Sequence, residues 1–270
     1  MLALDLLARY LAHHPYGVAA STETQLRCTW RVYLRDSHSS GPEAFDCQRV
    51  NDWLDELRET RAPDTVRTQR GNLLVVWWWA YREGLVREPP LRVRRLRPIS
   101  RSPTAWTVEE VRTLIAAAES YQTRPHWTGS LIRAAYDTGL RLGDLLSLRR
   151  DQVGPTLRVT QHKTRRVIHL VLRPETLTAI DRHVAIAPPH ILAWPLWGRR
   201  EAFYRHFNRI VRAADIRPGT FRWLRRTAAT QLERIEPGRG TELLGHQSRS
   251  TTEAWYIDRG QLGTPPLPPM

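Results

Sequence analysis

Apolar residues recur at helical spacing through residues 1–90 of this chain. The spacing predicts helices over residues 2–13, 22–35, 50–57 and 63–83. The last of these begins at Pro63 and stops before Gly84, the usual order of proline and glycine at helix ends. Because Trp77, Trp78 and Trp79 lie in its apolar run, packing between helices is favoured over stacking on bases. Four helices with short polar loops predict a compact bundle.

The pattern changes in the second part of the chain. Thr107 and Glu110 form a capping-box sequence at the start of a helix over residues 107–118. Leu157 and Val159 alternate with polar residues, and β-branched residues follow, so residues 156–172 predict two strands with a turn between them. Helices are expected at residues 128–137, 141–149, 174–184, 201–214, 220–235, 239–245 and 250–257. The fold class is therefore mainly α, with a helical first domain and an α+β second domain.

A proline pair and a basic segment separate the two parts. Pro89 and Pro90 stop the helical pattern, so the expected boundaries are residues 1–90, a linker over 91–105, a second domain over 106–260 and a Pro-rich tail over 261–270. The linker has almost no core-forming periodicity and is rich in arginine: Arg92, Arg94, Arg95, Arg97 and Arg101. We interpret it as a strap along a phosphate backbone. A solvated basic tether is the alternative.

Charge narrows the class of partner. The 270 residues carry a formal net charge of +14, and the pI is near 10.9, so a polyanion, with nucleic acid first, is the expected partner. Residues 1–100 have a net charge of +3 and residues 101–270 of +11. Cys28 and Cys47 have neither a disulfide nor a zinc spacing. Together with the lack of a bilayer-length apolar run or a signal sequence, this predicts a cytoplasmic protein without a membrane or metal partner.

The basic residues contain one exception. Of the 41 basic residues, 40 are arginine, and the remaining one is Lys163, at the turn between the two predicted strands. A guanidinium keeps its proton at any usable pH, whereas an ammonium can give one up. Lys163 is therefore a candidate general acid, and codon bias that left one lysine by chance is the alternative.

Four short segments of the second domain carry candidate chemistry. In TGLRLGDLLSL, Arg141 stands at a helix start, where anions bind, and Asp144 can hold its guanidinium. In FRWLRRTAAT, three arginines at i, i+3 and i+4 repel one another unless an anion neutralises them. LLGHQS contains His246, and TTEAWYI contains Tyr256. The candidate residues in chain order are Arg141, Lys163, Arg222, Arg225, His246 and Tyr256.

In this order the segments resemble the tyrosine recombinase (phage integrase) family. The resemblance covers nearly the whole chain and implies a SAM-like helical core-binding domain, a basic linker and a catalytic domain with a small antiparallel sheet. It implies that Tyr256 attacks a DNA phosphodiester to form a 3′-phosphotyrosyl link, while Arg141 and Arg225 hold the phosphate oxygens. Lys163 would protonate the leaving 5′ oxygen, and His246 would hydrogen-bond the phosphate or help to orient it. Neither ATP, metal nor another cofactor is required.

The chain departs from the family pattern in two places. Arg222 stands where the family usually has a histidine with a base or proton-shuttling role, and arginine cannot accept a proton. We expect Arg222 to be a further phosphate donor, with the surrounding arginines lowering the pKa of the tyrosine, and reduced activity is the alternative. The nucleophile commonly lies nine residues after the histidine, which here is Trp255, and Tyr256 is one residue later.

These observations predict a site-specific recombinase that cleaves and rejoins DNA strands. The expected partners are double-stranded DNA and three further copies of the chain, with a monomer or weak oligomer when free, in a prokaryotic cytoplasm. Arg165, Arg166 and Arg226 join the linker arginines as expected DNA contacts. A DNA-binding protein of recombinase ancestry that no longer cuts, and a type IB topoisomerase-like enzyme, are the alternatives. The DNA site, the direction of reaction and the host element stay open.

Overall fold

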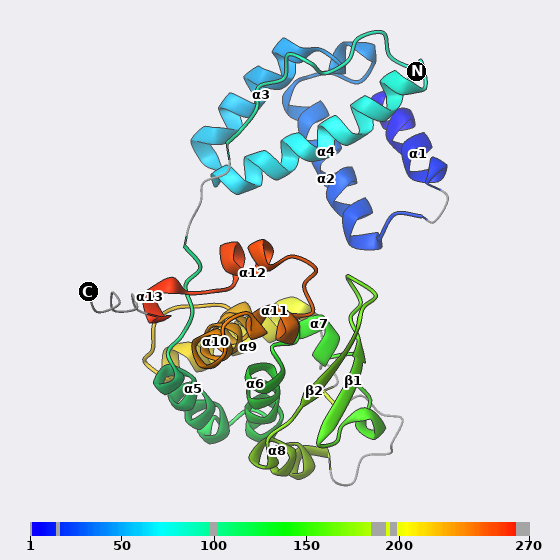
Figure 1. Ribbon diagram of the computed structural model, residues 1–270. Helices are drawn as coiled ribbons and strands as arrows, with labels where there is room; N and C mark the ends of the chain where they lie inside the picture. The colour runs from blue at the N-terminus through cyan, green and yellow to red at the C-terminus, as the bar shows by residue number, and fades with distance from the viewer. Residues whose placement is uncertain (1, 15–16, 98–101, 185–192, 195–198, 263–270) are drawn as a thin grey trace, which may run out of the picture. The chain divides into compact units, whose positions relative to one another are not determined.

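The computed structural model describes residues 2–14, 17–97, 102–184, 193–194 and 199–262. The chain divides into two compact units, residues 1–100 and 101–270 (Figure 1). Both units are mainly helical, and the second contains a small antiparallel sheet, which confirms the predicted fold class. Among the described helices, none has both the length and the apolarity that a bilayer span requires.

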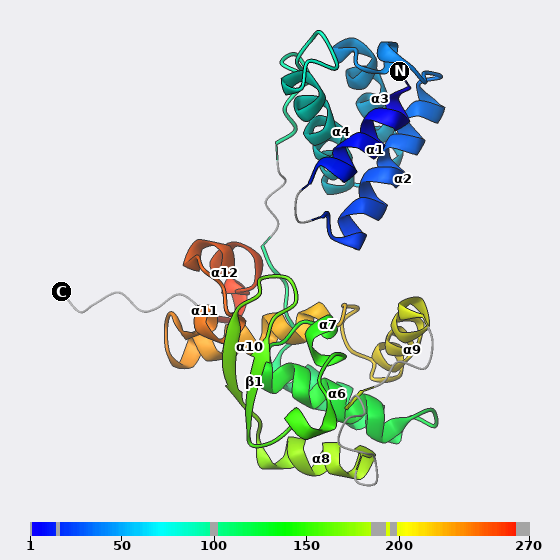
Figure 2. The same cartoon turned by 90° about the vertical axis from the view of Figure 1, so that its right-hand side faces the viewer.

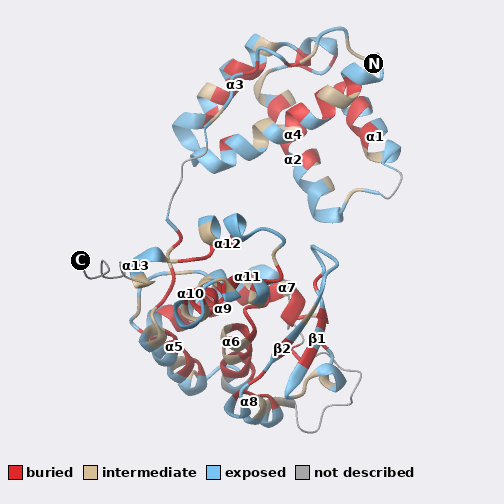
Figure 3. Cartoon of the chain, viewed as in Figure 1, coloured by how far each residue is buried: buried red, intermediate tan, exposed pale blue. Residues whose placement is uncertain are grey.

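The first unit contains the four predicted helices and one short 3-10 turn. They are α1 (Ala3–His13), α2 (Ala20–Asp36), η1 (Pro42–Ala44), α3 (Cys47–Thr60) and α4 (Pro63–Arg82). Asp46 caps α3 because its carboxylate accepts a hydrogen bond from the backbone N–H of Arg49 at 2.7 Å. Their buried sides face one another, as the burial colouring in Figure 3 shows.

Aromatic rings form much of the core of this unit. Trp30, Tyr33 and Trp53 pack edge to face, and Trp77 is 1% exposed, with its indole N–H donating to the carbonyl of Glu88 at 2.8 Å. Trp78 and Trp79 are partly buried against the same core. The interpretation of the tryptophan run as helix packing is confirmed.

Residues 92–94 are bonded to the first unit. Val93 is buried in its core, and the Asn51 side chain donates to the carbonyl of Arg92 at 3.1 Å and accepts from the N–H of Arg94 at 2.9 Å. Arg70 donates to the carbonyl of Val93 at 3.1 Å. The sequence pattern did not predict this attachment, because a single apolar residue between arginines has no periodicity.

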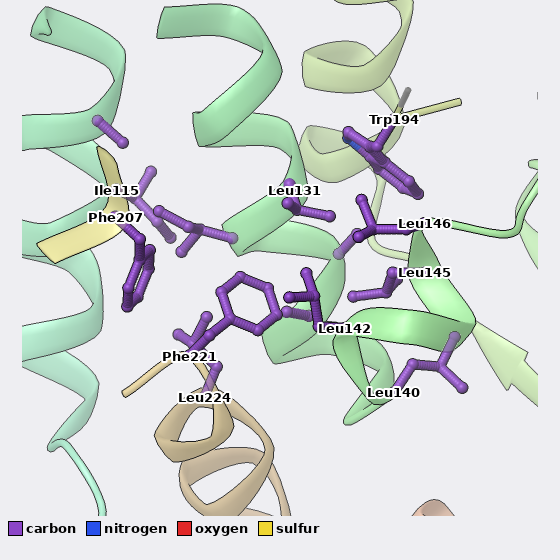
Figure 4. Packing of buried hydrophobic residues seen from close by; sticks show 14 of the residues in the cluster. Ile115, Leu131, Leu140, Leu142, Leu145, Leu146, Trp194, Phe207, Phe221 and Leu224 are labelled. Carbon is purple, nitrogen blue, oxygen red and sulfur yellow. The ribbon is translucent and has the colours of Figure 1, made fainter. Parts of the chain in front are cut away.

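Near the start of the second unit, Trp106 is buried in the core, and two helices that pack against each other, α5 and α6, follow it. Thr107 and Glu110 form the predicted capping box of α5, with hydrogen bonds of 3.1 and 2.7 Å. The described elements are α5 (Val108–Ser120), α6 (Pro125–Thr138), α7 (Leu142–Leu145), η2 (Arg150–Gln152), β1 (Thr156–Thr160), β2 (Val167–Val171), α8 (Pro174–Val184), α9 (Arg200–Ala213), α10 (Arg222–Ile235), α11 (Arg239–Leu244), α12 (Arg249–Trp255) and α13 (Arg259–Leu262). Figure 4 shows Leu131 of α6 among leucines of α7 and Phe221, at the N-terminus of α10.

One predicted helix is much shorter than expected. The pattern predicted residues 141–149, but α7 ends at Leu145. The Ser147 hydroxyl donates to the carbonyl of Asp144 at 2.7 Å, and the carbonyl of Leu148 accepts from Ala193 at 2.8 Å. The Ser147 hydroxyl bond, which competes with the helical backbone bonds, therefore ends the helix early.

The two strands form the predicted hairpin, which is drawn as a pair of arrows in Figure 2. Their register runs from Thr156 opposite Val171 to Thr160 opposite Val167. Leu157 and Val159 are buried, as their alternation predicts, and residues 161–166 form the turn.

Candidate active site

Arg141 is positioned by the break between α6 and α7. Gly139 ends α6 in the left-handed conformation, with φ of +58°, and a Cβ there would lie 3.2 Å from a Leu244 methyl carbon. Arg141 is then the N-cap of α7, and its Nη1 lies 3.8 Å from Oδ2 of Asp144. Both of these atoms are buried and have no hydrogen-bond partner among the described residues. The Arg141 side chain thus has an unused buried donor.

Arg225 lies on the inner side of α10 and is 2% exposed. It donates through Nη1 to the carbonyl of Gly139 and through Nη2 to the carbonyl of Leu244, the latter at 2.9 Å. Both carbonyls lie at helix C-termini, where the peptide dipoles favour a cation. Burial, together with the charge of Arg141, lowers the pKa of Arg225 to about 10, so it stays charged at neutral pH. Its Nε is buried and lacks a partner among the described residues.

His246 follows α11 and joins this cluster through both ring nitrogens. Arg225 Nη2 lies 3.2 Å from Nε2, and since a guanidinium only donates, Nε2 accepts. The ring proton is then on Nδ1, which donates to Oγ1 of Thr252 at 2.9 Å. Burial, followed by the charges of Arg225 and Arg141, lowers the pKa of His246 to about 4. The imidazole is therefore neutral at pH 7.

Tyr256 comes directly after α12, and its side chain is buried against the cluster. Arg222 Nη2 donates to the phenol oxygen at 3.0 Å, and the Arg222 and Arg225 Cζ atoms lie 4.8 and 5.2 Å from the ring centroid. The His246 ring centroid is 4.8 Å from that of Tyr256. Burial alone would raise the pKa of Tyr256, but the charges of Arg225 and Arg222 outweigh it and bring the pKa below its ordinary value. This arrangement favours the phenolate, which is the nucleophilic form.

The structure therefore brings five of the six predicted residues together, and Lys163 is the exception. Lys163 is exposed in the hairpin turn, and among the described residues it makes no contact with the cluster. The base of the turn is bonded to the cluster: Gln161 Nε2 donates to the Leu244 carbonyl at 3.0 Å, and the His162 N–H donates to Oδ1 of Asp144 at 3.0 Å. The hairpin is thus fixed next to the cluster while its turn faces solvent.

The arginines expected to contact DNA fall into three groups. Arg92, Arg95, Arg97 and Arg165 are exposed. Arg94 pairs with Asp55, Arg166 donates to the carbonyl of Gly245 at 3.1 Å, and Arg226 donates to the carbonyls of Trp255 and Thr104 at 3.2 and 3.1 Å. Arg101 lies outside the described residues. The second group has bonds within the protein that the sequence did not reveal.

Two residues of the site were not predicted. Thr252 fixes the His246 ring, and nothing in the sequence distinguishes its hydroxyl from that of any other buried threonine. Gln161 had a signal: the alternation of Leu157 and Val159 puts it on the buried face of the hairpin, where a polar side chain needs a specific partner. No cluster of His, Cys, Asp or Glu suited to a metal occurs in the described part of the chain.

Comparison with known proteins relates this fold to proteins that act on DNA. The model of the phage integrase family matches residues 105–261, which include all six candidate residues. The chain belongs to the phage integrase family, and the resemblance expected from the sequence is confirmed.

Three similar proteins illustrate the relationship. The tyrosine recombinase XerD of Lacticaseibacillus casei is 22% identical over 265 residues, which cover 88% of each chain. A lambda integrase dimer bound to a COC′ core site has a TM-score of 0.79, 22% identity and 97% coverage of both chains. A lambda integrase tetramer bound to a Holliday junction has a TM-score of 0.74 and 20% identity, over 92% of this chain and 78% of the other. At this identity the structures support the two-unit fold.

Proposed function

We propose that the chain is a tyrosine-type site-specific recombinase that cleaves and rejoins DNA at the cluster around Tyr256. The observation that carries the proposal is a pair of buried donors, Arg141 Nη1 and Arg225 Nε, without a partner among the described residues and close to a buried phenol. Unpaired buried cationic donors are unfavourable unless an anion binds them. A DNA phosphodiester supplies such an anion and also the atom that a phenolate attacks.

The chemistry follows from the position of each group. The Tyr256 oxygen attacks phosphorus, the bond to the 5′ oxygen breaks, and a 3′-phosphotyrosyl link forms. Arg141 and Arg225 stabilise the charge on the non-bridging oxygens, and His246, whose Nε2 accepts from Arg225, orients that guanidinium toward the phosphate. Lys163 donates a proton to the leaving 5′ oxygen once DNA lies over the hairpin turn. A 5′-hydroxyl from another strand reverses the attack, so the bond energy is retained without ATP.

Arg222 has a different role from the histidine that it replaces. It cannot remove the phenol proton, but its donor lies 3.0 Å from the phenol oxygen and stabilises the phenolate. The proton leaves to water before the attack, so the cluster activates the nucleophile by charge and needs no general base at this position.

The assembly of this chain is proposed with support from its structural neighbours. The lambda integrase structures contain a dimer on a core site and a tetramer on a Holliday junction. We propose that this chain likewise binds double-stranded DNA, assembles as four copies during strand exchange and works on DNA in a prokaryotic cytoplasm.

The test is the covalent intermediate. A DNA site is first selected from a random duplex library on the full chain, and a nicked suicide duplex of that site is then incubated with the protein. We expect a protein–DNA adduct that Tyr256→Phe abolishes. A site that is bound but never linked would support a DNA-binding protein that no longer cuts, and relaxation of supercoiled DNA without sequence preference would support a topoisomerase.

A further inference from the structure

Side chains on one face of α10 form hydrogen bonds with the segment that contains Tyr256. Arg222, Arg226 and Thr230 are spaced at i, i+4 and i+8, so they lie on the same side of the helix. Arg225 lies on the neighbouring side of the helix and points toward the carbonyl of Leu244 in the active-site cluster. The helix therefore presents one row of residues to the nucleophile and a separate residue to the substrate.

Each residue of this row bonds a different atom near the nucleophile. Arg222 reaches the phenol oxygen, and Arg226 Nε donates to the carbonyl of Trp255 at 3.2 Å. The Thr230 hydroxyl donates to the carbonyl of Tyr256 at 3.4 Å, and it accepts from the N–H of Asp258 at 3.0 Å. The backbone is thus bonded immediately before and after the side chain that reacts.

The second bond of Arg226 extends this arrangement to residues 104–105, which lead into α5. Arg226 Nη1 donates to the carbonyl of Thr104 at 3.1 Å, and the Asp258 carboxylate accepts from the N–H of Ala105 at 3.0 Å. Arg226 is half-buried, and burial, followed by the charge of Arg222, lowers its pKa. Because Nε and Nη1 of Arg226 donate to the carbonyls of Trp255 and Thr104, two of its donor nitrogens are already used within the protein.

We propose that Arg226 and Thr230 are positioning residues that fix the backbone around Tyr256, so that the phenol meets the phosphorus in line, and that Arg226 is not a DNA contact. This inference rests on the proposed function and replaces the DNA-binding role expected for Arg226 from the sequence. A displacement of about 1 Å at a nucleophile lowers a rate by roughly a hundredfold. The positioning bonds should therefore affect the attack and leave DNA affinity and phosphate activation unchanged.

The first experiment uses Arg226→Lys in the full chain, because it keeps the charge. A lysine carries its donors on a single nitrogen, so it cannot place donors at both positions that Nε and Nη1 of Arg226 occupy. On the selected suicide duplex, we expect adduct formation to slow by about tenfold to a hundredfold while the Kd for DNA stays within about twofold of wild type. Arg234→Lys is the matched control, since Arg234 is exposed on the same helix, and it should keep the wild-type rate.

The second experiment separates the nucleophile from the phosphate cluster. In a Tyr256→Phe background, added hydroperoxide takes the place of the phenolate, attacks phosphorus and releases the 5′ oxygen, which leaves a nick without an adduct. Adding Arg226→Lys to this background should not change the rate of peroxide scission. An equal slowing of the peroxide and tyrosine reactions would overturn the inference, as would a wild-type adduct rate in Arg226→Lys.

Thr230 provides an independent test if Arg226→Lys does not fold. Thr230→Val removes the hydroxyl at nearly constant volume, and Thr230→Ser retains it. We expect the valine variant to form the adduct slowly, the serine variant to recover most of the rate, and both to melt within a few degrees of wild type. Equal rates in the two variants would contradict the role of the hydroxyl. Absence of an adduct from wild type tests the proposed function instead, because the inference depends on the ratio of variant to wild type.

Discussion

At the residue scale, the active-site cluster combines a buried phenol with three guanidinium groups. Arg222 donates directly to the Tyr256 oxygen, whereas Arg225 lies against the ring and is fixed by two helix-end carbonyls. The charges of both arginines lower the pKa of the phenol, and Arg222 also donates to the oxygen that reacts.

The pH dependence of cleavage should reveal the role of Arg222. The phenolate is the reactive form, so the rate should rise with pH and reach a plateau once the pH exceeds the pKa of Tyr256, which lies below its ordinary value. Arg222→Gln removes both the charge and the charged donor, so the pKa should rise and the plateau should move to higher pH. At pH 7 we expect about a tenfold slower single-turnover cleavage. An unchanged profile would contradict activation by Arg222, and Arg234→Gln is the matched control.

Lys163 is tested by the chemistry of the leaving group. Lys163→Arg keeps the charge but cannot release a proton, so cleavage of normal DNA should slow by about a hundredfold. A substrate with sulfur in place of the bridging 5′ oxygen needs no proton on its leaving group and should restore most of the rate. Equal losses on the two substrates would mean that Lys163 only binds DNA.

At the element scale, the hairpin depends on the turn between α11 and α12. Gly245 has φ of +63°, and a Cβ there would lie 2.9 Å from Cγ2 of Ile168 and 3.2 Å from Nε2 of Gln161. The same turn supplies the carbonyls that hold Gln161 and Arg166. The position of the hairpin and that of His246 are thus set by one glycine.

Gly245→Ala should destabilise the second unit by about 1–2 kcal/mol, because an alanine in the left-handed conformation is strained. The crowding at Ile168 adds to this strain and should displace the hairpin. Urea unfolding followed by circular dichroism measures the loss. Gly154→Ala is the control in the same unit, since its added Cβ would meet nothing closer than 3.9 Å. Similar stabilities of the two variants would contradict this role of Gly245.

The elements also show what sequence patterns can predict. Helix starts at Pro63 and Thr107 were predicted because caps and prolines are local signals. The early end of α7 was not, because leucines at helical spacing continue beyond Leu145. The attachment of Val93 to the first core was not predicted either, because a single apolar residue between arginines has no periodicity.

At the scale of the whole molecule, the charge pattern predicted the partner class but not the function of each arginine. The formal net charge is +14, but not every arginine is free to bind a partner, because Arg94, Arg166 and Arg226 are bonded within the protein. The ordered segments predicted five of the residues that gather at the site, since each segment has its own local signature, and Lys163 is exposed apart from them. The carbonyls of Gly139 and Leu244, which accept from Arg225, could not be predicted, because every residue has a backbone carbonyl whatever its side chain.

The row on α10 also limits how this gene can change. The helix turns by about 100° per residue, so a one-residue insertion between positions 222 and 230 would turn the residues beyond it away from Tyr256. Substitutions at exposed positions of α10 leave this spacing intact. We therefore expect related sequences to vary in composition along α10 and to keep its length, while insertions and deletions collect in the loops on either side.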